Sequence, residues 1–129
     1  MNQTHALIID DNIRNMNVLS MLLSEHGVST TQVINPAKLE TILQGMDKTD
    51  VIFLDLEMPD KSGYEVFDLL KTYTRFQHVP VIAYTVHVSE INAVHQQGFD
   101  GFIGKPLDPD RFPDQLARIL NGQPVWEVA

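Results

Sequence analysis

Each of four short apolar runs in this sequence ends at side chains that can bind a metal ion or an anion. The end residues are Asp10 with Asp11, Asp55, Thr85 and Lys105, which follow the runs 6–9, 51–54, 79–84 and 101–104. If the runs are parallel strands, these groups meet at one edge of a sheet, where ligands of open parallel sheets bind. Carboxylate oxygens suit a small divalent cation, and a hydroxyl and an ammonium group suit phosphate oxygens. The set therefore predicts a divalent-metal site that handles a phosphoryl group.

Segments of helical periodicity alternate with these runs. Strands are expected at 5–10, 28–34, 50–54, 80–84 and 101–104, and helices at 12–26, 36–46, 64–73, 89–97 and 108–120. Asn12, Ser89 and Asp108 are expected to cap their helices, and Pro113 predicts an irregular start of the last one. Five strands alternating with five helices predict an α/β fold, a doubly wound parallel sheet covered on both faces.

Composition limits the classes of function. The chain has 129 residues, 43% of them hydrophobic, a net charge of −8 and no cysteine. This length is typical of one domain, and the apolar runs are too short to span a membrane. Basic residues are scattered, so direct nucleic-acid binding is not expected. Without a signal-peptide pattern, a cytoplasmic location is expected, and the missing cysteines exclude disulfides and thiolate metal sites.

The order and spacing of the motifs resemble the receiver domain of two-component response regulators. The resemblance rests on Asp10-Asp11, on Asp55 with Met58-Pro59 and Gly63, on Thr85, and on Lys105-Pro106. It covers about residues 5–121, so the chain is divided into a receiver domain at 1–121 and a C-terminal tail at 122–129. The resemblance implies a flavodoxin-like strand order of 2-1-3-4-5. Because the chain ends soon after the last expected helix, a stand-alone, single-domain regulator is expected.

The resemblance also implies a role for each site residue. Asp55 would accept a phosphoryl group from a histidine kinase or a phosphotransfer protein. Mg²⁺ would bind Asp11 and Asp55 directly, Asp10 through a water, and the backbone carbonyl of Glu57. Thr85 would hydrogen-bond the phosphoryl group and Lys105 would neutralise its charge. Such a domain catalyses only its own phosphorylation and dephosphorylation, so it is not expected to be an enzyme.

Signal output would pass through Thr85 and Phe102 in proteins of this kind. When the Thr85 hydroxyl moves toward the phosphoryl group, Phe102 would fill the vacated space and alter the face formed by the fourth helix, fifth strand and fifth helix. That face would contact a downstream protein, and it is also where receivers commonly form homodimers. The alternative is that Phe102 is an ordinary core or surface aromatic.

Two positions depart from the usual receiver pattern. Val86 stands where receivers usually carry Ala or Gly, and its bulk would slow both phosphorylation and hydrolysis. Glu57, two residues after Asp55, adds negative charge to a site whose side chains already include three carboxylates against one lysine, and it would also modulate these rates.

Other interpretations remain open at this point. Val86 motivates a degenerate receiver that acts only as a binding module. An aspartyl-nucleophile phosphatase of the haloacid-dehalogenase type is less favoured, because its nucleophile lies on the first strand. The histidines (5, 26, 78, 87 and 95) lack metal-ligand spacing and are interpreted as surface residues. Trp126, in the tail, is either a docking anchor or part of a disordered end.

Overall fold

The structure, a computed structural model, describes residues 3–46, 48–58 and 61–127. Its strands are β1 (His5–Ile9), β2 (Ser29–Val33), β3 (Val51–Leu54), β4 (Val81–Thr85), β5 (Gly101–Gly104) and β6 (Val125–Glu127). Its α-helices are α1 (Ile13–Ser24), α2 (Leu39–Gln44), α3 (Gly63–Lys71), α4 (Ile91–Gln97) and α5 (Phe112–Leu120). Single 3₁₀ turns cover Pro36–Lys38, Thr74–Phe76 and Val88–Glu90. No helix in this part of the chain is long and apolar enough to cross a membrane.

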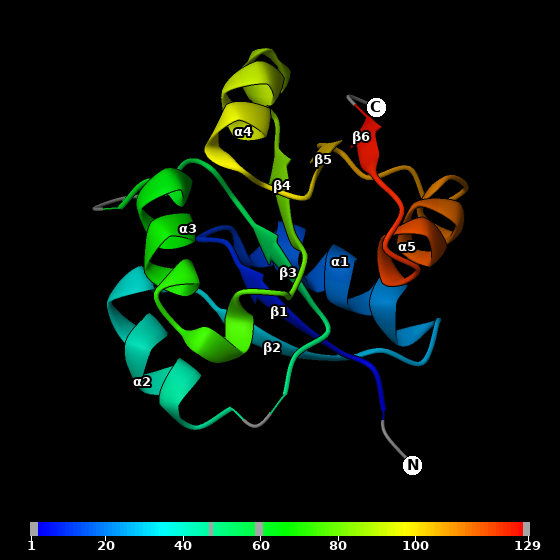
Figure 1. Ribbon diagram of the computed structural model, residues 1–129. Coiled ribbons are helices and arrows are strands. Elements are labelled where there is room, and N and C mark those ends of the chain that lie inside the picture. The colour runs from blue at the N-terminus through cyan, green and yellow to red at the C-terminus, as the bar shows by residue number, and fades with distance from the viewer. Residues whose placement is uncertain (1–2, 47, 59–60, 128–129) are drawn as a thin grey trace.

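The strands form one parallel sheet in the order β2-β1-β3-β4-β5-β6. The doubly wound fold and the order of the first five strands are confirmed, and β6 is an addition at the sheet edge that the sequence did not predict. Helices cover both faces of the sheet (Figure 1). The core between the sheet and α2, α3 and α4 contains Val66, Phe67 and Val94, and the core on the α1 and α5 side contains Met16 and Phe112.

Local sequence explains where several helices begin. The Asn12 side chain accepts a hydrogen bond from the Asn15 amide, as its prediction as a cap requires. Ser62 and Glu65 form a reciprocal capping box at the start of α3. These caps satisfy amides that the first helical turn leaves without partners. They hold two helices that begin directly after the loops of the predicted site.

The predicted caps at Ser89 and Asp108 are wrong. Ser89 lies inside the 3₁₀ turn that precedes α4. The helix itself begins after Glu90, and no side chain caps it. Asp108 accepts from the Asp110 amide in an irregular turn, and α5 begins only after Arg111. Pro113 lies at the start of that helix, where its missing N–H costs no hydrogen bond. The helix therefore begins at Phe112, after an irregular turn, and the expected irregular start is confirmed.

The end of the chain pairs with the sheet. Trp126 lies on β6, half-buried, and its neighbour in register on β5 is Phe102. The sequence offered a docking anchor or a disordered end for this residue, and the structure shows a strand instead. Figure 1 shows β6 beside β5, between α4 and α5.

Candidate functional site

The sheet brings the chemically active strand-end residues to one edge. β1 and β3 are neighbours, although β2 lies between them in sequence, so the chain changes direction at this point of the sheet. Hydrogen bonds between neighbouring strands continue one residue past the strand ends. The Asp55 amide donates to the Ile9 carbonyl, and the Lys105 amide donates to the Thr85 carbonyl. Backbone hydrogen bonds of this kind hold the side chains on rigid positions at the switch point, where ligands of such sheets bind.

Three carboxylates converge at this edge. Asp10, Asp11 and Asp55 each offer an oxygen atom, and these atoms lie within 4.8 Å of one another. Asp10 is fully buried and Asp55 nearly so, whereas Asp11 is exposed to solvent. Two buried acids beside an exposed one form a cluster that is open on one side, a suitable arrangement for a hydrated divalent cation.

The Lys105 side chain lies within this cluster. Its Nζ donates to Asp10 Oδ2 at 2.9 Å and lies 3.7 Å from Asp55 Oδ1. The ammonium group also lies 4.3 Å from the centre of the Tyr84 ring, a cation–π contact. Tyr84 is buried, and its hydroxyl donates to the Asn15 carbonyl. The buried Tyr84 ring thus holds the lysine ammonium group in place. The position of Tyr84 at the end of an apolar run did not predict this role.

Asp55 holds its proton more tightly than an ordinary aspartate. Burial raises the pKa of Asp55 to about 7; Lys105 opposes this effect, and the Asp10 charge adds to it. The dominant cause is desolvation, which disfavours the charged carboxylate. A nearby divalent cation would favour the ionised form, so metal binding and ionisation of Asp55 are expected to occur together.

Gly63 allows the loop after β3 to return close to the acid. A Cβ atom at this position would lie 2.5 Å from the Asp55 carbonyl oxygen and 2.7 Å from Leu56 Cα. The Gly63 amide donates to the Leu56 carbonyl. A residue without a side chain is therefore needed at position 63, where the chain leaves the loop; Pro59 lies outside the described residues.

Thr85 and Phe102 are both buried. Thr85 ends β4, between the strands that carry Asp55 and Lys105, and its hydroxyl accepts from the His87 amide at 3.2 Å. Phe102 lies on β5 and packs into the core on the α2–α4 side. The structure thus places Phe102 inside the protein; whether it also switches stays a prediction.

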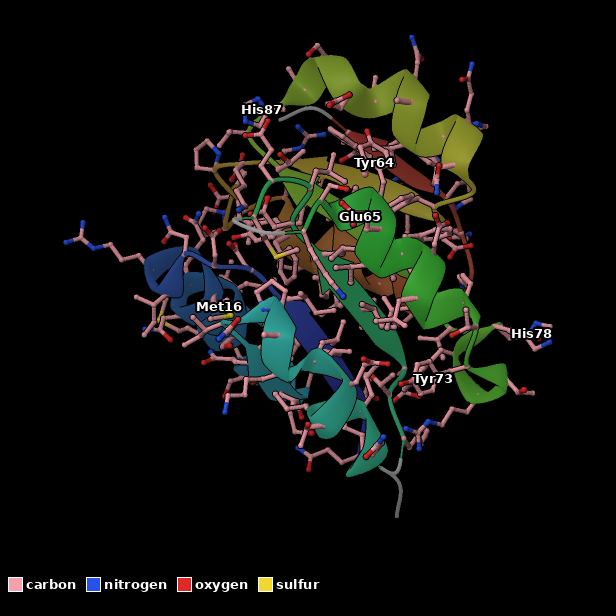
Figure 2. The ribbon with its side chains drawn as sticks, turned by 90° about the vertical axis from the view of Figure 1, so that its left-hand side faces the viewer. Met16, Tyr64, Glu65, Tyr73, His78 and His87 are labelled. Carbon is pink, nitrogen blue, oxygen red and sulfur yellow. The ribbon has the colours of Figure 1, made fainter. Side chains whose placement is uncertain are left out.

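A side-chain contact between His87 and Glu57 joins two loops beside the site. His87 Nε2 lies 2.9 Å from Glu57 Oε2, and both side chains are largely exposed. Figure 2 shows His87 and His78 on opposite sides of the molecule. The pair joins the loop after β3 to the loop after β4. Val86 lies beside it with 60% of its surface exposed.

Sequence reasoning missed the histidine of this pair. His87 lies on the surface, as predicted, but its contact with Glu57 joins loops that are distant in sequence. Two other histidines also make specific contacts. The His5 ring bonds the hydroxyls of Ser29 and Thr31, and the His95 ring lies 4.7 Å from that of Trp126.

The described residues thus combine a buried acid that can act as a nucleophile, an acidic cluster that fits a divalent cation, and an ammonium group. Asp55 offers an oxygen on a rigid strand end, which aids in-line attack. Lys105 and a cation would offset negative charge on a transferring phosphoryl group. These are the requirements of phosphoryl transfer to a carboxylate.

Comparisons with known proteins agree with this geometry. A polar-differentiation response regulator, DivK of Brucella anthropi, is 31% identical over 119 residues, covering 90% of this chain and 95% of that protein. A probable histidine kinase of Oryza sativa subsp. japonica is 28% identical over 140 residues, which are 14% of its own length. The chemotaxis response regulator CheY4 of Vibrio cholerae has the same fold, with a TM-score of 0.81 at 22% identity over 92% of this chain and 99% of that one.

A further solved structure shares the fold. The receiver domain of sensor histidine kinase PA1611 from Pseudomonas aeruginosa, described with a magnesium ion in its active-site cleft, matches with a TM-score of 0.80 at 21% identity over 93% of this chain and 99% of that one. The model of the response regulator receiver domain matches residues 6–117. The chain therefore belongs to the receiver-domain family of two-component response regulators.

Proposed function

We propose that Asp55 is the phosphoryl acceptor of this receiver domain and that Mg²⁺ assists the transfer. The proposal is supported chiefly by one observation: Asp10, Asp11 and Asp55 converge within 4.8 Å, and Lys105 contacts two of them. A structural role alone does not account for gathering three acids at the switch point of the sheet, because like charges at this distance repel one another.

The proposed step forms an acyl phosphate. A carboxylate oxygen of Asp55 attacks the phosphorus atom of a phosphohistidine, the P–N bond breaks, and the imidazole nitrogen leaves with the bond's electron pair. Lys105 offsets the charge on the phosphoryl oxygens, and Thr85 donates its hydroxyl hydrogen to one of them. Water later attacks the phosphorus atom, the P–O bond to Asp55 breaks, the carboxylate is restored and inorganic phosphate is released.

The acidic cluster fits the chemistry of Mg²⁺. Asp11 and Asp55 would bind the ion, Asp10 would act through a water, and the Glu57 carbonyl would complete the protein ligands, because Mg²⁺ prefers oxygen and retains several waters. The bound ion would neutralise charge on the phosphoryl group. Asp10 already accepts from Lys105 and from the Asn12 amide, which agrees with a supporting role for this acid.

The proposed partners are a histidine kinase or phosphotransfer protein as donor and a downstream protein as target, in the cytoplasm. Phosphorylation would act through Thr85 and Phe102 on the surface formed by α4, β5 and α5. Drawing the Thr85 hydroxyl toward the phosphoryl group would change the packing around Phe102 and bias that surface between two states. A homodimer through the same surface belongs to this proposal. Chemical-shift changes on adding beryllofluoride should therefore include residues 85–105, and changes confined to the Asp55 loop would contradict the switch.

Incubation with acetyl phosphate, followed by intact-mass measurement, tests the chemistry. The wild type should gain one phosphoryl mass with Mg²⁺, and much less with EDTA. Asp55→Asn should gain none, whereas Asp68→Asn, a control on the exposed side of α3, should behave as the wild type. An unmodified wild type would favour the binding module, and rapid turnover of a phosphomonoester would favour the phosphatase.

A further inference from the structure

The β5 edge holds the chain's own C-terminal strand in a fitted position. β6 pairs parallel to β5, with Val125 opposite Gly101, Trp126 opposite Phe102 and Glu127 opposite Ile103. Side chains alternate between the two faces of a strand. Val125 and Glu127 therefore face the α5 side of the sheet, and Trp126 faces the α4 side.

The first position accepts an aliphatic side chain and a close backbone. Val125 is fully buried in the core on the α1 and α5 side. A Cβ atom on Gly101 would lie 2.8 Å from the Val125 carbonyl oxygen. Only glycine allows the two strands this close approach, so the edge of β5 is shaped to receive another backbone.

The second position accepts an aromatic ring. Trp126 packs against the core on the opposite face, and its ring lies 4.7 Å from that of His95 on α4. Because Phe102 is its neighbour in register, Trp126 also lies beside the buried aromatic of β5. A large planar side chain here fills the space between the sheet edge and α4.

The third position accepts an acid. Glu127 accepts hydrogen bonds from Arg111 at 2.9 Å, from Gln115 at 2.8 Å and from Arg118 at 2.6 Å. Gln115 and Arg118 lie on α5, and Arg111 directly precedes this helix. Hydrogen bonds from Gln115 and Arg118 hold the pKa of Glu127 below its usual range. In a chain with net charge −8, two arginines directed at one carboxylate form a local site for an acidic group.

We propose that the β5 edge between α4 and α5 is a binding groove for an extended aliphatic–aromatic–acidic protein segment, and that residues 125–127 are its resident, displaceable occupant. Strand addition of this kind draws affinity from backbone hydrogen bonds and specificity from alternate side chains. While β6 is seated, no other strand can pair with the β5 edge that faces away from β4. A partner that presents the same three-residue pattern must therefore replace it.

The short strand is suited to replacement. It has three residues at a sheet edge, and its charged contacts with Arg111 and Arg118 are open to water on one side. Such segments open locally without global unfolding. A tethered strand nevertheless competes at an effective concentration on the order of millimolar, so a free segment at micromolar concentration binds well only when the resident strand is weakened.

A labelled peptide with the sequence of residues 123–129 tests this in the full chain by fluorescence anisotropy. The doubly substituted chain Trp126→Ala, Glu127→Gln should bind the peptide at least tenfold more tightly than the wild type does. Replacing the peptide's glutamate by glutamine, or adding Arg118→Met to the chain, should remove that gain. Circular dichroism checks that each variant is folded, and the single variant Glu127→Gln is used if the double one is not.

Three results would overturn the proposal: no binding to either chain, equal binding to both, or a gain that survives Arg118→Met. Light scattering covers the remaining alternative. A wild-type dimer that Glu127→Gln dissociates would mean that the strand comes from a second copy. None of these measurements requires phosphorylation, so the groove and the phosphoryl-acceptor proposal succeed or fail separately.

Discussion

Lys105 lies closer to Asp10 than to Asp55: its Nζ is 2.9 Å from an oxygen of the first and 3.7 Å from an oxygen of the second. The buried ammonium group is thus fixed by Asp10, which leaves the Asp55 oxygens less engaged. Such an arrangement keeps Asp55 available to a reacting group while its charge is still partly offset.

Lys105→Met should destabilise the metal-free protein by about 3–5 kcal/mol at pH 8, because it leaves two buried carboxylates without their cation. The loss should be smaller at pH 5, where Asp55 is protonated. Urea unfolding at both pH values measures it. Lys48→Met, which removes the surface pair with Asp50, should cost no more than about 1 kcal/mol. Equal effects of the two substitutions would contradict the buried role of Lys105.

The contribution of Asp55 to the stability of the metal-free protein should fall as pH rises from about 4 to about 7. The folded protein keeps a proton on Asp55 up to a pKa of about 7, whereas the unfolded chain releases it near 3.8. Stability decreases wherever the folded state binds more protons than the unfolded state, and it levels off above the folded pKa.

The difference between the wild type and Asp55→Asn isolates this contribution from other titrating groups. Unfolding in urea with EDTA, measured from pH 4.5 to pH 8, should show the variant gaining on the wild type through this window. A constant difference between the two proteins would show that Asp55 has an ordinary pKa.

Gly63→Ala should lower stability by about 1–3 kcal/mol, the usual cost of overpacking, because the new methyl group would meet the backbone of Asp55 and Leu56. It should also displace Asp55 and slow phosphorylation. Gly45→Ala is the matched control, since its nearest neighbour would lie at 3.7 Å. Denaturant midpoints for the two variants decide the matter, and similar midpoints would show that the loop relaxes freely.

Val86→Ala should speed both phosphorylation by acetyl phosphate and decay of the acyl phosphate. The branched side chain stands beside the site, where a donor or a water must approach, and a gain of about 1.4 kcal/mol in transition-state stabilisation gives a tenfold rate. Val88→Ala, at another exposed valine of the same loop, should leave both rates unchanged. If Val86→Ala reacts no faster than the wild type, Val86 does not obstruct the site.

The sheet and the strand-end residues could be predicted because they follow from local pattern. Apolar runs that end in polar groups place Asp55, Thr85 and Lys105 at one edge once the strands are parallel. The Glu57–His87 pair could not be predicted, because its distance depends on how two loops fold over the site. β6 escaped prediction for a similar reason: three residues carry no periodicity, and the contacts of Glu127 come from α5.

The caps that failed share one cause. Ser89 and Asp108 are good capping residues by type, but 3₁₀ and irregular turns precede α4 and α5 and move the first helical turn away from them. Element boundaries depend on such local competition more than element identity does.

Locating the phosphoryl group on the chain tests the central claim most directly. After reaction with acetyl phosphate and Mg²⁺, borohydride reduction converts an aspartyl phosphate to homoserine, and tandem mass spectrometry identifies the position. We predict homoserine at position 55, in amounts that fall sharply when EDTA replaces Mg²⁺. Homoserine at position 10 or 11 instead, or a phosphoryl mass that borohydride leaves in place, would contradict the assignment of Asp55 as the acceptor.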